Sequence, residues 1–190
     1  NCKISNKILD NLSFQLTKSQ SRVLSEINKD LKSETRMFRI LQGDVGSGKT
    51  IVSLLAAANI VESGNQCALM APTEILAKQH YDLAKKIFYD SNVQIDFLTG
   101  KTEVGERKKI IKKLENGSIN IIIGTHSLFQ KKINFNNLGL TIIDEQHKFG
   151  VKQRSELAKK GGVNCDVLLL SATPIPRTMM MSFYGDMDVS

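Results

Sequence analysis

The feature that most constrains the fold of this chain is the segment 43–50, which reads GDVGSGKT and fits the pattern G-x-x-x-x-G-K-[ST] at every fixed position. Gly43, Gly46 and Gly48 allow a tight, concave backbone turn, because glycine alone reaches positive φ angles without steric cost. Successive N–H groups then point inward beside the N-terminus of a following helix, and together they favour an anionic phosphate. The pattern therefore requires a strand before the loop and a helix after it.

The neighbours of this loop supply both elements. Residues 37–41 form a short, mainly apolar strand candidate, and residues 49–63 form a helix candidate that stops at Gly64. A glycine-rich turn with a chance lysine would need neither neighbour. We therefore predict a nucleoside triphosphate site, with Lys49 at the β- and γ-phosphates and the Thr50 hydroxyl on Mg²⁺. The rest of the predicted cradle is formed by Gly43, Asp44, Val45, Gly46, Ser47 and Gly48.

Composition supports one soluble domain and indicates the kind of partner. The chain has 190 residues, of which 41% are hydrophobic and 24% charged, enough for a sizeable core. No run of 18 apolar residues or signal-peptide pattern occurs, and a start at Asn1 suggests a piece of a longer polypeptide. The net charge of +7 favours polyanions such as nucleic acid, although many lysine-rich proteins carry that balance without binding nucleic acid.

The cysteines match no metal-binding pattern, because Cys2, Cys67 and Cys165 lie far apart in the sequence. Cys67 and Cys165 fall in or beside apolar strand candidates, where a free cysteine packs as a small hydrophobe. A reducing cytoplasm is the compartment that fits this usage best.

Strand and helix patterns alternate along most of the chain, which predicts a doubly wound, mainly parallel α/β sheet with helices on both faces. A helix is expected from Thr17, where Thr17 and Gln20 form a capping box. Residues 1–15 are interpreted as a linker from a preceding domain or as the tail of a preceding element, and residues 16–190 as a single domain. The other expected strands are 67–71, 93–98, 119–123, 140–143 and 166–170, and the other expected helices are 74–89, 103–116 and 152–160.

Two groups of polar residues follow apolar strands. Asp144 and Glu145 come after the strand at 140–143, and acidic groups at the end of a buried strand need a partner. A Mg²⁺ bound to Thr50 and Asp144 supplies that partner, and Glu145 would then orient and deprotonate the attacking water. The alternative is a capped turn with solvated carboxylates. Ser171 and Thr173 follow the strand at 166–170, where hydroxyl groups can report the state of the site or simply form a strand-to-helix turn before Pro174.

These segments, in order along the chain, resemble the Q motif and motifs I, II and III of superfamily 2 helicases. The longer runs at 41–50, 71–80, 144–150 and 171–178, with the ending at 184–190, resemble the RecG family of bacterial ATP-dependent DNA helicases, which remodel stalled forks and Holliday junctions. The transcription-repair coupling factor shares the phosphate loop but usually has glutamate where this chain has Gln146, which favours the RecG family. The resemblance spans roughly residues 12–190.

The resemblance implies a RecA-like P-loop NTPase domain with ATP and Mg²⁺ as cofactors. Gln20 would bind the adenine edge, a geometry that amide groups suit, unless the capping box with Thr17 engages it. Gln146 and His147 belong to motif II beside the catalytic Lys49 and Glu145, and His147 would couple hydrolysis to DNA instead of binding metal.

The resemblance also implies contacts with the DNA backbone in motifs Ia, Ib and Ic. Thr73 and Thr125 could equally be helix caps, and His80 is interpreted as a structural residue of a helix. The lysine pairs at 108–109 and 112–113 are expected to form a solvated helix face, because like charges at that spacing repel. The implied DNA-binding residues are Pro72, Thr73, Thr99, Gly100, Thr125 and His126.

The chain would then be the first motor lobe of a helicase, with branched or duplex DNA, a second RecA-like lobe and a wedge domain as partners, and no membrane. Phosphoryl transfer of this type usually needs an arginine finger, which the resemblance places in the second lobe. We therefore expect the isolated chain to bind ATP weakly and to hydrolyse little. A metabolic P-loop kinase should show an arginine-rich lid, which is not evident, and a non-hydrolytic nucleotide switch would not need Glu145.

Overall fold

In the part of the chain that the computed structural model describes, seven strands form one sheet and all their pairings are parallel. The structure describes residues 3–12, 14–33, 35–130, 132–145, 165–172 and 188–189. Its elements are α1 (Lys3–Asn11), α2 (Lys18–Asp30), β1 (Phe38–Gln42), α3 (Lys49–Glu62), β2 (Gln66–Met70), α4 (Glu74–Ile87), β3 (Ile95–Leu98), α5 (Val104–Glu115), β4 (Ile121–Gly124), the short 3₁₀ helix η1 (His126–Phe129), β5 (Leu138–Glu145), β6 (Asp166–Ser171) and β7 (Asp188–Val189).

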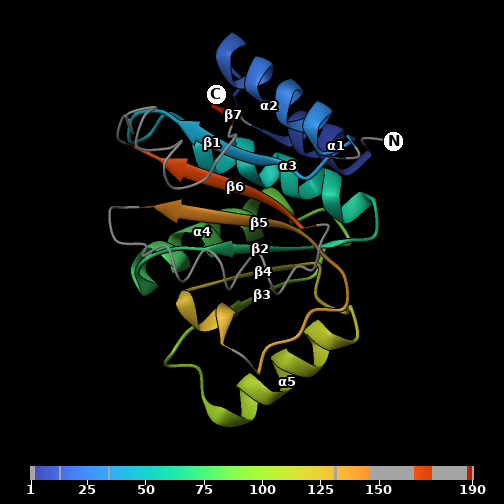
Figure 1. Cartoon of the computed structure of the whole chain (residues 1–190), viewed down its shortest axis with the longest axis vertical. Coiled ribbons are helices and arrows are strands. Elements are labelled where there is room, and N and C mark those ends of the chain that lie inside the picture. The colour runs from blue at the N-terminus through green and yellow to red at the C-terminus, as the bar shows by residue number, and fades with distance from the viewer. Residues whose placement is uncertain are drawn as a thin grey trace.

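The strands do not follow chain order across the sheet. The order is β3-β4-β2-β5-β6-β1-β7, so β5 and β6 lie between β1 and β2 (Figure 1). The loop after β1 therefore has the end of β6 beside it and the end of β5 one strand further away. In open α/β sheets, ligands bind outside the carboxyl ends of the strands where the strand order reverses.

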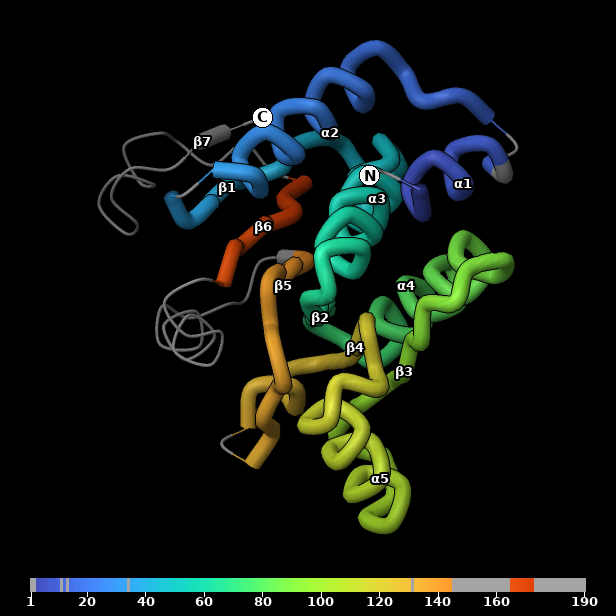
Figure 2. The backbone as a smooth tube through the Cα atoms, turned by 90° about the vertical axis from the view of Figure 1, so that its right-hand side faces the viewer, coloured from blue at the N-terminus to red at the C-terminus, as the bar shows by residue number. Residues whose placement is uncertain are grey.

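Helices cover both faces of the sheet, as the sequence predicts. Side chains that alternate along each strand divide between two hydrophobic clusters, for example Leu41 in one and Ile40 in the other. The first cluster includes apolar residues of α1, α2, α3 and α4, and the second includes Ile110 and Leu114 of α5 and Leu128 of η1. Figure 2 shows α1, α3 and α4 on one side of the strands.

α3 is the central helix of the first layer. All seven residues from 52 to 58 are buried, because α1 and α2 cover the side of α3 that the sheet does not. A helix that is apolar around its circumference is typical of such a sandwiched position. Asn59 of α3 donates a hydrogen bond of 2.6 Å to Asn28 of α2.

α2 is held over β1 by a buried cation. The Arg39 side chain of β1 is 8% exposed and pairs with Glu26 at 3.1 Å and with Asp30 at 2.6 Å. Taking a guanidinium out of water is costly without such partners. The pairing places the N-terminus of α2, which carries Gln20, next to the loop that follows β1.

The N-terminal segment differs from the expected linker, because residues 3–11 form a helix that packs on α3. Ile4 and Ile8 are four residues apart and share one face, and Ile8 is 3% exposed within the core. The backbone N–H of Ile4 also donates to the Glu62 carboxylate of α3. Attachment of this segment to a preceding domain stays a prediction.

Where the sequence predicts a boundary within the described residues, the structure places it within two residues of that position, and the 3₁₀ helix η1 was not predicted. Cys67 and Cys165 are buried as expected, and burial raises the pKa of both thiols. The two-residue strand β7 was not predicted, because so short a segment carries no periodicity. The helix expected at 152–160 lies outside the described residues. Among the helices that the structure describes, none is long and apolar enough to cross a bilayer.

Gly124→Ala is expected to lower the free energy of unfolding by about 1–3 kcal/mol, the usual cost of overpacking. A Cβ at this position would lie 1.9 Å from the carbonyl oxygen of Leu98, a backbone atom of β3 that moves only if the β3–β4 pair opens. Gly105→Ala in α5 is the matched control, because its Cβ would meet open space. Urea unfolding monitored by circular dichroism gives the free energy of unfolding of both variants. A value for Gly124→Ala equal to that of Gly105→Ala would contradict the prediction.

Candidate nucleotide site

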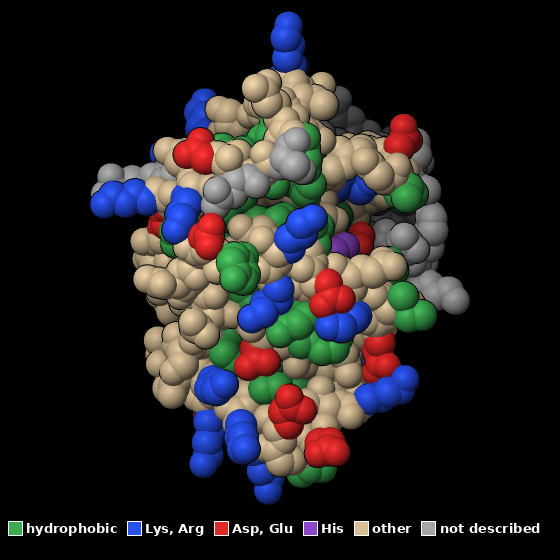
Figure 3. All heavy atoms as spheres, turned by 180° about the vertical axis from the view of Figure 1, so that it is seen from behind, with side chains coloured by type: hydrophobic (Ala, Val, Ile, Leu, Met, Phe, Trp, Pro, Cys, Tyr) green, Lys and Arg blue, Asp and Glu red, His purple; other side chains and the backbone are tan. Residues whose placement is uncertain are grey.

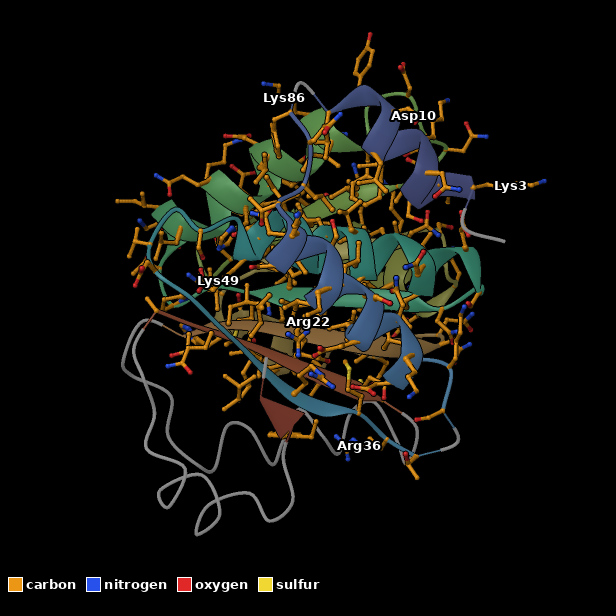
Figure 4. The ribbon with its side chains drawn as sticks, turned by 90° about the horizontal axis from the view of Figure 1, so that it is seen from above. Lys3, Asp10, Arg22, Arg36, Lys49 and Lys86 are labelled. Carbon is orange, nitrogen blue, oxygen red and sulfur yellow. The ribbon has the colours of Figure 1, made fainter. Side chains whose placement is uncertain are left out.

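The loop at 43–50 connects β1 to α3, in the context that its sequence pattern requires. Gly46 and Gly48 have φ angles of +82° and +83°, which other residues rarely adopt. Gly43 does not share this conformation, and a Cβ there would lie 2.7 Å from the Ser47 hydroxyl, which would have to rotate away. Figure 4 shows Lys49 at the beginning of α3, on the same edge of the sheet as this loop.

The Lys49 ammonium group lies inside the curve of the loop. It donates hydrogen bonds to the carbonyl oxygens of Gly43 at 2.6 Å and Asp44 at 2.7 Å, and lies 3.4 Å from the Ser47 hydroxyl. A phosphate in the loop would compete with these oxygens for the ammonium group, and a charge-assisted contact to phosphate is the stronger of the two. Lys49 therefore lies within the loop, and its contact with the β- and γ-phosphates stays a prediction.

The N-terminus of α3 provides the second component of an anion site. Its N-cap is Gly48, which has no side chain to satisfy the first-turn N–H groups. Free N–H groups at a helix start, together with the helix dipole, attract negative charge. The loop and the helix therefore converge on one region that suits phosphate.

The ends of β1, β6 and β5 are in register at this edge. Gln42, directly before the loop, pairs with Ser171, and Ser171 pairs with Glu145. The N–H of Gly43 donates to the carbonyl oxygen of Ser171 at 3.1 Å. The backbone of motif III therefore lies between the phosphate loop and the acidic end of β5.

Asp144 and Thr50 line a common cavity of about 280 Å³, together with Val45, Gly46, Gly48, Lys49, Ile51, Leu76, His80, Leu83, Leu170 and Ala172. A hydroxyl and a carboxylate are oxygen donors, which Mg²⁺ prefers. The residues of this cavity therefore fit Mg²⁺, and Thr50 and Asp144 would hold it.

Asp144 makes a contact that sequence reasoning missed. The Nε2 atom of His80 lies 2.6 Å from Oδ2 of Asp144, and both side chains are largely buried. His80 occupies the buried face of α4 with Ala77 and Ala84. A histidine within that small, apolar stripe was the signal that could have indicated a polar partner on the sheet.

Gln20 serves the capping box and the loop at the same time. The side-chain Oε1 of Gln20 accepts a hydrogen bond from the backbone N–H of Thr17 at 2.9 Å. The backbone N–H of Gln20 donates to the Thr17 hydroxyl at 3.2 Å. Its Nε2 donates to the carbonyl oxygen of Ser47 at 2.8 Å. The side chain therefore completes the capping box and contacts the loop together, whereas the adenine contact, which the sequence weighs against the capping box, stays a prediction.

The residues predicted to contact DNA follow β2, β3 and β4, at the same edge of the sheet. Thr73 is the N-cap of α4, where its hydroxyl accepts from the N–H of Leu76. Thr99 and Thr125 are buried and bond within their own loops, to the N–H of Lys101 and to the Ser127 hydroxyl. The side chains of Thr99 and Thr125 therefore stabilise their loops. The exposed residues of the predicted set are Thr73, Gly100 and His126, and Pro72 is partly buried.

Lysines 108, 109, 112 and 113 of α5 are exposed, as expected for a solvated face. Figure 3 shows blue basic side chains at the lower end of the molecule, over α5, with red acidic side chains among them. Lys113 lies 3.9 Å from Asp96. Three further predicted residues, Gln146, His147 and Thr173, lie outside the described residues, and only the backbone of Glu145 is described.

Comparison with known proteins identifies the family. The sequence profile of the DEAD/DEAH box helicases matches residues 17–182. The chain belongs to this family. It is 48% identical over 189 residues to the ATP-dependent DNA helicase RecG of Aquifex aeolicus and 50% identical over 188 residues to that of Thermotoga maritima. In each case 99% of this chain is covered, but the chain spans only about a quarter (24%) of the relative's length.

Solved structures agree with this assignment. A RecG bound to a three-way DNA junction superimposes with a TM-score of 0.87 and 45% identity, over 100% of this chain and 25% of that one. The DEAD-box helicase Mss116 superimposes with a TM-score of 0.77 and 22% identity, over 98% of this chain and 42% of that one, which supports the fold alone. The predicted RecA-like helicase domain is thus confirmed, as is the resemblance to RecG.

Thr17→Ala and Gln20→Ala separate the capping function from the loop function. Both variants break the capping box, so each is expected to lose about 1 kcal/mol of stability. Only Gln20→Ala also loses the hydrogen bond to Ser47, and its affinity for a fluorescent ATP analogue is expected to fall about threefold to tenfold. Equal nucleotide affinity in the two variants would contradict a role for Gln20 at the loop.

Proposed function

We propose that this chain is the ATP-binding motor lobe of an ATP-dependent DNA helicase that remodels branched DNA, such as stalled forks and Holliday junctions, in recombination and repair. The observation that carries the proposal is the register of Gln42, Ser171 and Glu145. This register aligns the phosphate loop with the starts of motifs II and III at one edge of the sheet. The similarity to RecG over nearly the whole chain supports DNA as the partner. We place the activity in the cytoplasm.

Each residue of the site has a proposed chemical role in ATP hydrolysis. Lys49 neutralises charge on the β- and γ-phosphates, and the Thr50 hydroxyl and Asp144 carboxylate hold Mg²⁺, which supplies further charge neutralisation when bound. Glu145 orients the attacking water and accepts its proton. Gln146 and His147 follow directly and would pass the state of this site to the DNA-binding surface.

The other residues connect the site to its partners. Ser171, through its backbone bond to Gly43, and Thr173 would couple hydrolysis to motion. The DNA backbone would lie along the carboxyl edge of β2, β3 and β4, against the exposed Thr73, Gly100 and His126, because contacts to phosphate and sugar position a protein on nucleic acid. A second RecA-like lobe and a wedge domain would complete the enzyme, because the relatives are about four times as long as this chain.

Glu145→Gln in the full-length protein tests the hydrolytic role. The amide cannot accept a proton from water, so turnover is expected to fall at least about 100-fold, while ATP affinity stays near the wild-type value. Steady-state phosphate release and equilibrium binding of a fluorescent ATP analogue measure the two quantities. Unchanged turnover would indicate a nucleotide switch in which Glu145 has no catalytic role.

Lys49→Ala is the matched control for this experiment. It removes a charge-assisted contact to phosphate, so ATP affinity is expected to fall about 10- to 100-fold.

A fork-regression assay with the wild-type protein then tests the proposed substrate. Displacement of stalled RNA polymerase without fork regression would instead assign the lobe to a transcription-repair coupling factor.

The isolated 190-residue chain is expected to bind ATP weakly and to show little ATPase activity, with or without DNA. The reason is that the arginine finger that such phosphoryl transfer usually requires is proposed to lie in the second lobe. Phosphate release measured with and without a DNA junction checks this expectation. Robust DNA-stimulated turnover by this chain alone would overturn it.

A further inference from the structure

We propose that His80 is a positioning residue for Asp144, which it holds in the orientation that leaves one carboxylate oxygen for Mg²⁺. The inference rests on the proposed function, since that function makes Asp144 a metal ligand. Its basis is the 2.6 Å contact between Nε2 of His80 and Oδ2 of Asp144. His80 comes from α4 and Asp144 from the end of β5, 64 residues apart in the sequence.

The chemistry of the two groups defines which atom donates. An ionised carboxylate only accepts hydrogen bonds, so the proton of this contact belongs to Nε2 of the imidazole. The bond occupies Oδ2 and restricts rotation of the carboxylate about its Cβ–Cγ bond. The second carboxylate oxygen, Oδ1, is then the one left for a metal ion, and Asp144 lines the same cavity as Thr50.

The surroundings strengthen this bond. The His80 side chain is 10% exposed and the Asp144 side chain 16% exposed. Leu76, Leu83 and Leu170 line the same cavity, and a hydrogen bond with little water around it is electrostatically stronger than one in bulk solvent.

His80 acts through Asp144 and is not itself a ligand. Mg²⁺ prefers oxygen donors to imidazole, and Nε2 is already engaged by the carboxylate. Outer partners that orient a ligating group typically change metal affinity by 10- to 100-fold when they are removed. The same magnitude is expected here.

Three substitutions separate positioning from packing. In His80→Gln the amide nitrogen of the new side chain lies four bonds from Cα, as Nε2 of histidine does, so this variant keeps a donor within reach of Asp144. His80→Asn also introduces a polar amide but is one bond shorter, and His80→Leu fills the space without a donor. Asp144→Asn is the control that removes the proposed ligand itself.

The measurement is the affinity for Mn²⁺, used as a probe for Mg²⁺, in the presence of a saturating non-hydrolysable ATP analogue. Electron paramagnetic resonance of free Mn²⁺ gives this affinity in the full-length protein. His80→Leu and His80→Asn are expected to weaken it 10- to 100-fold, and His80→Gln to restore it. Nucleotide affinity measured in EDTA is expected to be the same in all His80 variants, because the role concerns the metal.

The outcomes are distinct. Wild-type Mn²⁺ affinity in His80→Leu, with weakened affinity in Asp144→Asn, would overturn the positioning role and leave the proposed function intact. Unchanged affinity in Asp144→Asn as well would overturn the proposed metal site and this inference with it. If His80→Leu fails to fold, the difference between His80→Asn and His80→Gln decides, and equal affinities in that pair would overturn the role.

Discussion

The site depends on the parallel pairing of β1, β6 and β5. Each strand is mainly apolar until its last residues, and the register then aligns Gln42, Ser171 and Glu145 in one row. A slip of one residue would turn the buried side chains of a strand to the opposite face, so the two hydrophobic clusters fix this row. The polar groups of the site are positioned by the burial of apolar side chains behind them.

Much of the fold could be predicted from local sequence, because short apolar runs mark most strands and Gly64 marks the end of α3. The order of the strands could not, since the insertion of β5 and β6 between β1 and β2 arises from contacts between distant segments. The helix at residues 3–11 was not predicted for a related reason. Ile4 and Ile8 give α1 an apolar face, but only α3 and the Glu62 carboxylate explain why so short a helix packs there.

The site was predictable where one short segment carries the chemistry. The spacing of the glycines in the loop implied positive φ angles, and Gly46 and Gly48 have them. Contacts between segments were not predictable in the same way. For Gln20 the sequence suggested the adenine edge or the capping box. The structure shows the capping box together with a bond from Nε2 to the Ser47 carbonyl oxygen, which local sequence does not indicate. His80 was interpreted as a structural residue of a helix. Its partner, Asp144, lies 64 residues away, so local sequence could not indicate the contact.

Gln20 and His80 connect the two halves of the site to different helices. The loop is tied to α2 through Ser47, and the acidic end of β5 is tied to α4 through Asp144. α4 begins at Thr73, at the edge proposed to face DNA, and His80 lies seven residues further along, a rise of roughly 10 Å. A helix is stiff over two turns, so a displacement of its N-terminus would also move the imidazole that contacts Asp144. The edge proposed to face DNA and the carboxylate proposed to bind Mg²⁺ are therefore both in contact with one helix, α4.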